Sequence, residues 1–315
     1  MFIDSLITIL NPFLLFTTLL GVSLGIIWGA LPGLSTTMAM ALLIGFTSTM
    51  SQDTAICFML GVYTGSVFGG AISAILINIP GTPDAVPTMI EGHALAKKGE
   101  AGTALGTAIF GSFVGNWIGI LILIFLMPFL IAVALNFKSW EMFLLSIIGI
   151  SVCGTMCSGE LPIKGWIVGW IGILIAMVGI DPIFGVERFT FENPNFYDGF
   201  SYIPILIGLF GICEIIKTLP NQNKTPIPEK IGKLFLPLKQ LFSYVSTAVR
   251  SGLIGTFIGA LPGAGANVAS FLSYDIGKKR AKPSEKLKWG KGSYEAIISA
   301  EVANNANIGG SILPT

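Results

Sequence analysis

Charged residues are scarce in this sequence: Asp, Glu, Lys and Arg make up 11% of the 315 residues, whereas hydrophobic residues make up 53%. The mean hydropathy is +0.79. Soluble globular domains contain about 25% charged residues, so this composition excludes a typical water-soluble protein. Several apolar stretches reach the roughly 20 residues that a helix needs to cross a bilayer core. The sequence therefore predicts an all-α integral membrane protein, a helical bundle with several spans.

Histidine and cysteine are also scarce, which narrows the chemistry that the chain can perform. The one histidine, His93, lies in a charged stretch at 84–102 and is predicted to be solvated. No nucleophile–base pair, paired carboxylates or Cys/His cluster is present, so we expect neither an enzyme nor a bound metal or cofactor. The N-terminus has no basic region typical of a cleavable signal. Four cysteines in apolar surroundings are interpreted as packing residues: Cys57, Cys153, Cys157 and Cys213.

The sequence does contain a long-range repeat. GIIWGALPGLSTT at residues 25–37 returns as GTFIGALPGAGAN at residues 255–267, an offset of 230 positions. So long a spacing is not that of a solenoid unit, and it indicates two halves of one membrane protein. We divide the chain into a first transmembrane repeat with the spans that follow it, a basic cytoplasmic linker, and the start of an incomplete second repeat, at 1–216, 217–250 and 251–315.

Each copy of the repeat contains a Pro-Gly pair, Pro32-Gly33 and Pro262-Gly263. Proline removes a backbone donor and glycine tolerates unusual torsion angles, so we expect the helix to break there, inside the membrane. Open backbone at that depth is tolerated only where it is buried in protein or lines a wet cavity. After the first break, Ser35, Thr36 and Thr37 place hydroxyl groups at the N-terminus of the next half-helix.

A third Pro-Gly pair follows an apolar helix in the string NIPGTP at residues 78–83. We interpret it as a further broken helix with polar atoms from Asn78 and Thr82, and the alternative is an ordinary surface turn. Predicted apolar spans or half-spans lie at Phe13–Leu31, Ala39–Met50, Thr54–Ile79, Thr103–Leu135, Trp140–Ser158, Ile163–Ile180 and Phe200–Ile216.

The basic residues predict the topology. Residues 217–250 carry six of the 18 basic residues and residues 278–291 carry seven, so both segments are expected to be cytoplasmic. The second copy of the repeat lies between these two segments, so the chain there enters and leaves the membrane on the same side. Two half-spanning arms broken at Pro262-Gly263 or two short spans would both achieve this. Counting back from residue 217 through the predicted spans places the acidic loop 181–199 outside the cell and residues 84–102 in the cytoplasm. The first copy of the repeat then has the opposite orientation in the membrane to the second copy. The sequence thus predicts two inverted repeats.

The last segment, Ser299–Thr315, is predicted to be a helix that matches the one before NIPGTP. At an offset of 240 residues, Gly69-Gly70 aligns with Gly309-Gly310. No counterpart of residues 78–83 follows. We therefore expect the 315 residues to be a fragment or a truncated form of a longer two-half protein, with the second repeat incomplete.

Matched broken helices in two opposed halves indicate a transporter binding site near the membrane midplane. Half-helix N-termini carry partial positive charge and free amide donors, which suit an anion. Glu301, Asn304 and Asn305 are candidates for holding a coupling ion, because ionisable groups at membrane depth are usually functional. For Glu301 an interfacial position is the alternative.

Four segments of the sequence resemble the TctA family, the large permease subunit of bacterial tripartite tricarboxylate transporters. They are GALPGLSTT, GVYTGSVFGGAISAILINIPGTPDAVP, GALPGAGAN and EVANNANIGG. The resemblance implies uptake of carboxylates such as citrate across the bacterial inner membrane, driven by a Na⁺ or H⁺ gradient. It also implies two partners, a small membrane subunit (TctB-like) and a periplasmic solute-binding protein (TctC-like).

The resemblance further implies where substrate binds. A channel or a non-transporting membrane scaffold is the alternative, although neither needs two matched Pro-Gly breaks. The expected substrate-binding residues are Pro32, Gly33, Ser35, Thr36, Thr37, Asn78, Pro80, Gly81, Thr82, Pro262, Gly263, Gly265, Ala266 and Asn267.

Overall fold

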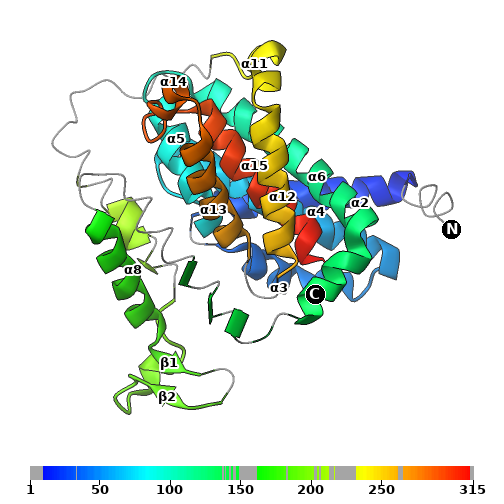
Figure 1. The fold of residues 1–315 in the computed structure, drawn as a ribbon. Helices are drawn as coiled ribbons and strands as arrows, with labels where there is room; N and C mark the ends of the chain where they lie inside the picture. The colour runs from blue at the N-terminus through cyan, green and yellow to red at the C-terminus, as the bar shows by residue number, and fades with distance from the viewer. Residues whose placement is uncertain are drawn as a thin grey trace.

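The computed structural model is a bundle of helices (Figure 1). It describes residues 10–32, 34–136, 138, 140–141, 143–144, 147–148, 162–181, 184–201, 204–205, 207–212, 216, 232–261 and 265–312. The α-helices are α2 (Pro12–Ala30), α3 (Thr36–Thr47), α4 (Gln52–Ile77), α5 (Val86–Ala96), α6 (Ala101–Asn136), α8 (Pro162–Ala176), α11 (Leu238–Ser243), α12 (Val245–Gly259), α13 (Gly265–Arg280), α14 (Pro283–Lys286) and α15 (Tyr294–Ser311). Short 3-10 turns η1 (Pro83–Ala85) and η2 (Pro194–Phe196) and a π-helical segment η3 (Ile207–Ile212) join them.

The remaining regular structure in the described residues is one small hairpin in the acidic loop. Strands β1 (Gly179–Ile180) and β2 (Glu187–Arg188) pair in antiparallel fashion. An ion pair of 2.7 Å between Arg188 and Asp181 closes the hairpin. The described residues are otherwise helical or irregular, which confirms the all-α prediction in its main features.

Helices α2 and α4 pack along interlocking glycine stripes. On α2, Gly21, Gly25 and Gly29 face the backbone of α4, and a side chain at any of them would collide with α4 carbonyl groups. Glycines on α4 face the α2 backbone in return, at positions 61, 65 and 69. Small residues at such spacing let membrane helices approach closely. The contact between α2 and α4 therefore depends on glycine at positions 21 and 25.

Helices α12 and α15 form a second pair that is built in the same way. Gly255 and Gly259 of α12 lie against the backbone of Ala303 and Asn307 of α15. These two glycines are the counterparts of Gly25 and Gly29 at the offset of 230 residues. The close helix pair is therefore a property of both copies of the repeat. The inverted orientation of the two copies stays a prediction.

The alignment of Gly69-Gly70 with Gly309-Gly310 is wrong by one residue. Gly69 packs on Ile26, Gly29 and Ala30. The residues 230 positions later are Thr256, Gly259 and Ala260, and these pack on Gly310 rather than on Gly309. In α4 the first glycine of the pair faces the partner helix, whereas in α15 the second one does. The first glycine of the α15 pair instead lies against Gly119 of α6.

Helix α15 occupies the centre of the bundle, between α6, α12 and α13 (Figure 1). All residues from Ala296 to Gly310 are buried. Glycines of α6 at positions 111, 115 and 119 lie against α15 and leave room for it. Ser293 caps the N-terminus of the helix, because its hydroxyl group accepts a hydrogen bond of 3.3 Å from the Ala296 amide.

The prediction that residues 84–102 form a polar loop with a solvated histidine is wrong. Most of this segment is helix α5, which packs against α4, α6 and α15. His93 is only 6% exposed, and its Nδ1 lies 3.1 Å from the carbonyl oxygen of Ile75. Glu91, one of the charged residues that suggest a loop, is held by hydrogen bonds within the fold.

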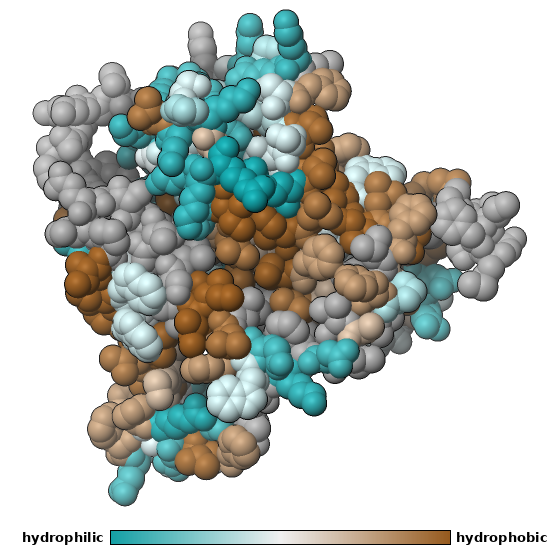
Figure 2. Space-filling model, in the orientation of Figure 1, coloured by the Kyte–Doolittle hydropathy of each residue, from teal (hydrophilic) through white to brown (hydrophobic). Residues whose placement is uncertain are grey.

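The apolar surface agrees with a membrane protein. Three helical stretches are long and apolar enough to cross a bilayer: Pro12–Ala30, Gln52–Ile77 and Ala101–Phe125. Figure 2 shows a broad hydrophobic surface, with hydrophilic residues gathered at the end of the molecule where α14 lies in Figure 1.

The predicted spans that begin at Phe13, Thr54, Thr103 and Ile163 each match a helix within a few residues. Most of the predicted spans Trp140–Ser158 and Phe200–Ile216 lies outside the described residues.

Candidate functional site

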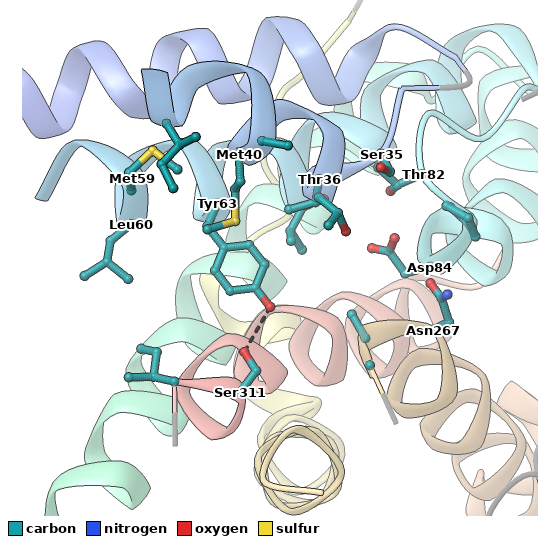
Figure 3. Close-up of a pocket in the computed structure, with 18 residues that line it drawn as sticks. Ser35, Thr36, Met40, Met59, Leu60, Tyr63, Thr82, Asp84, Asn267 and Ser311 are labelled. Atoms are coloured by element: carbon teal, nitrogen blue, oxygen red, sulfur yellow. Dashed lines mark hydrogen bonds between the residues drawn. The ribbon is translucent and has the colours of Figure 1, made fainter. Parts of the chain in front are cut away.

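A cavity of about 1100 Å³ lies between the two copies of the repeat. The first copy contributes Ser35, Thr36 and Thr37, and the second contributes Gly265, Ala266 and Asn267 (Figure 3). These residues are counterparts of one another at the offset of 230 residues. Thr82, Pro83 and Asp84 add a third wall, and the remainder of the lining is largely apolar, from α3, α4 and the end of α15.

Two helix N-termini meet at this cavity. Helix α3 begins after Ser35, whose hydroxyl group accepts a 3.0 Å hydrogen bond from the Met38 amide. Helix α13 begins at Gly265, which has a positive φ of 66° that few residues other than glycine adopt. The first amides of a helix have no intrahelical acceptor and carry partial positive charge. The cavity is therefore a favourable place for a negatively charged group.

The helices that follow the two breaks are short. Helix α3 has 12 residues and α13 has 16, so that they extend about 18 Å and 24 Å at 1.5 Å per residue. A bilayer core is about 30 Å thick. Helix α2 ends at Ala30 and α12 at Gly259, each a few residues before the next helix starts.

The string NIPGTP is a buried break rather than a surface turn. Helix α4 ends at Ile77, and Asn78 adopts a left-handed conformation with φ of 58°. Pro80 and Gly81 are buried, and the Gly81 amide donates a 3.2 Å hydrogen bond to the Gly70 carbonyl oxygen. A side chain at position 81 would collide with the backbone of α2 at Gly29. The break is thus held between the ends of α2 and α4.

The structure brings together only part of the predicted substrate-binding set. Seven of these residues line the cavity: Ser35, Thr36, Thr37, Thr82, Gly265, Ala266 and Asn267. Four others do not line it: Pro32, Asn78, Pro80 and Gly81. Gly33, Pro262 and Gly263 lie outside the described residues.

Two of the three predicted ion-coupling residues are held by hydrogen bonds inside the bundle. Glu301 is fully buried, and its carboxylate accepts hydrogen bonds from Thr88 at 2.6 Å and Ser112 at 3.1 Å. Asn305 donates to the Ser112 hydroxyl oxygen at 2.9 Å and to the Glu301 carbonyl oxygen at 3.0 Å. This network joins α5, α6 and α15 and keeps the Glu301 carboxylate away from the surface of the bundle.

The third candidate, Asn304, has a different environment. It is fully buried, and neither polar atom of its amide makes a hydrogen bond to any described residue. It lies beside Asp84, a cavity residue that the sequence reasoning missed. The clue available in the sequence was an acid directly after the Pro-Gly-Thr-Pro break. Tyr63 and Ser311 were missed as well, and their hydroxyl groups form a 2.9 Å hydrogen bond across the cavity wall (Figure 3).

Glu91 fastens α5 to the turn before α15. It accepts hydrogen bonds from the Tyr274 hydroxyl group at 2.6 Å and from the amides of Gly290, Gly292 and Ser293 at 2.5, 3.0 and 2.9 Å. Burial raises the pKa of Glu91, and these four hydrogen bonds oppose that rise. Because α5 follows η1 directly, this contact fixes one wall of the cavity.

No metal-binding cluster of three or more His, Cys, Asp or Glu side chains occurs in the part of the chain that the structure describes. A helical membrane protein with a partly polar cavity between the N-termini of two short helices has the architecture of a membrane transporter. The chain belongs to the tripartite tricarboxylate transporter TctA family, which matches residues 15–315.

A curated relative in Agrobacterium vitis is 36% identical over 309 residues, which cover 98% of this chain and 61% of the relative. That protein is called an uncharacterized 52.8 kDa protein in the TAR-I ttuC′ 3′ region. The chain thus spans about three-fifths of the length of the relative. Comparison with the solved structures finds no match.

Proposed function

We propose that this chain acts in the permease subunit of an ion-gradient-driven tripartite transporter, which takes up tricarboxylates or related carboxylates such as citrate. The observation that carries the proposal is the shared cavity, in which Ser35–Thr37 of one repeat face Gly265–Asn267 of the other. Family membership supports a role in tricarboxylate transport.

The chemistry of the cavity suits a carboxylate. Amides at the start of α3 and α13 and the hydroxyl groups of Ser35, Thr36 and Thr37 are hydrogen-bond donors. No lysine or arginine lines the cavity in the described residues. A carboxylate bound by neutral donors can leave again more readily than one bound to a buried guanidinium group, and release is part of every transport cycle.

The proposed mechanism is alternating access, and it depends on the predicted inversion of the two repeats. Each repeat brings one short helix to the cavity, and the proposed inverted orientation would let one repeat open the site outward while the other opens it inward. In the cell we place the protein in the bacterial inner membrane, with a TctB-like small subunit and a TctC-like periplasmic binding protein that delivers substrate. The coupling ion is Na⁺ or H⁺.

The test is uptake of labelled citrate and smaller dicarboxylates into proteoliposomes that contain the full permease, its small subunit and the cognate binding protein. We expect saturable uptake that needs both an ion gradient and the binding protein. A correctly inserted complex that transports no acid from a broad panel would contradict the proposal and favour a scaffold. Uptake that neither saturates nor needs a gradient would favour a channel.

A further inference from the structure

Unsatisfied polar atoms gather beside the cavity. Three neighbouring residues here have buried side-chain atoms without a hydrogen-bond partner among the described residues. These atoms are Thr82 Oγ1, Asp84 Oδ2, and Nδ2 and Oδ1 of Asn304. The side chains are 1%, 5% and 0% exposed, in the same order. Buried polar groups in folded proteins almost always have partners. Such a group of unpaired atoms indicates that something else satisfies them.

The three residues lie together although they come from distant parts of the chain. The side chains of Thr82 and Asn304 lie beside the Asp84 carboxyl group but outside hydrogen-bonding geometry. Thr82 and Asp84 belong to the turn that follows Pro80-Gly81, and Asn304 lies in the middle of α15. The Asp84 carbonyl oxygen also accepts a 2.9 Å hydrogen bond from Ser270 of α13. The group therefore lies where the first repeat contacts the second.

The available atoms suit a hard, monovalent cation. A carboxylate, a hydroxyl group and an amide carbonyl group supply oxygen ligands, which hard cations prefer. One carboxylate balances one positive charge, whereas divalent ions usually require more acidic ligands. A proton on Asp84 would pair with only one of the neighbouring oxygens. A cation could contact Thr82 Oγ1, Asp84 Oδ2 and Asn304 Oδ1 together.

We propose that Thr82, Asp84 and Asn304 form a binding site for a monovalent cation of the Na⁺ type, at the edge of the cavity. Figure 3 shows Asp84 between Thr36 and Asn267, so its negative charge faces the space that we assign to the substrate. A bound cation cancels this charge, and an anion then enters without repulsion from Asp84. This second step, in which the cation assists the anion, rests on the proposed function, whereas cation binding itself does not.

The experiment measures cation binding without substrate. The thermal unfolding of the purified, full-length permease complex is followed while NaCl replaces choline chloride at constant ionic strength. We expect a saturable rise of Tm with Na⁺, because a ligand that binds only the folded state stabilises it. Asp84→Asn should remove the rise. Thr82→Val should weaken the apparent affinity about tenfold, as expected for the loss of one neutral ligand.

The matched control is Glu295→Gln. Glu295 is a half-buried carboxylate on the same helix as Asn304, but a 2.7 Å hydrogen bond from Thr247 already satisfies it, so this variant should keep the Na⁺ response. Loss of the response in Glu295→Gln with retention in Asp84→Asn would overturn the proposal. If Asp84→Asn does not fold, an unchanged Na⁺ affinity in Thr82→Val overturns it.

Failure of this inference can be told apart from failure of the proposed function. A wild-type complex that transports citrate but shows no Na⁺-dependent rise of Tm overturns the cation site and leaves the permease assignment in place. A complex that binds Na⁺ through Asp84 but transports no carboxylate supports the site and contradicts the proposed function.

Discussion

The Thr88 hydroxyl group donates a 2.6 Å hydrogen bond to the Glu301 carboxylate and so joins α5 to the middle of α15. Both side chains are fully buried. Replacing Thr88 by valine keeps the shape of the side chain and removes the donor. We expect the free energy of unfolding in detergent to fall by about 1–3 kcal/mol, because a buried carboxylate loses a partner. The control is Thr49→Val at an exposed position, and an equal effect of both changes would contradict this role for Thr88.

The glycine stripes of α2 and α12 should not tolerate even a methyl group. In Gly25→Ala and Gly255→Ala the new Cβ would collide with the backbones of Val62 and Ala303, and overpacking of this kind costs about 1–3 kcal/mol. Gly45 is the matched control, since a Cβ there meets nothing within 4 Å. Gly45→Ala should be neutral or stabilising, because alanine is the better helix former. Thermal unfolding of the three variants measures this difference.

The hydrogen bonds of Glu91 make it a structural anchor for α5. Tyr274→Phe removes one donor and should destabilise the protein by about 1–2 kcal/mol, and Glu91→Gln should cost more because it loses the charge that accepts all four hydrogen bonds. The control is Glu285→Gln, which breaks an exposed pair with Lys288 and should change stability by less than about 1 kcal/mol. A similar Tm for Glu91→Gln and Glu285→Gln would show that the buried contact adds no stability.

Much of this architecture was predictable because the repeat and the apolar stretches are local features of the sequence. The close α2–α4 packing follows from glycines spaced four residues apart, and the break after Ile77 follows from Pro80-Gly81. The position of Asp84 was not predictable, since it depends on contacts with Asn304 and Ser270 about 200 residues away. His93 was misread for a related reason. Its neighbours suggest solvent, and only the tertiary packing against α4 shows that it is buried.

Residues from the two copies should contribute to substrate affinity together. Thr37→Val and Asn267→Leu each remove polar groups from one side of the cavity, and each should weaken carboxylate binding about tenfold, the effect of losing one hydrogen bond to a charged group. Neither should change Tm, because both side chains are exposed. Isothermal titration of the purified complex with citrate, with Ser48→Ala as an exposed control, tests this. Unaltered affinity in both variants would exclude these side chains from the site.

The central claim, that substrate lies between the N-termini of α3 and α13, is tested most directly by protection of introduced cysteines. Thr36→Cys and Ala266→Cys are made one at a time in the full-length permease without its native cysteines, together with Asn195→Cys on the exposed acidic loop as the control. The rate of thiol labelling is then measured with and without a transported carboxylate. The account predicts that substrate slows labelling at positions 36 and 266 and leaves position 195 unchanged. A transported substrate that protects neither position would contradict it.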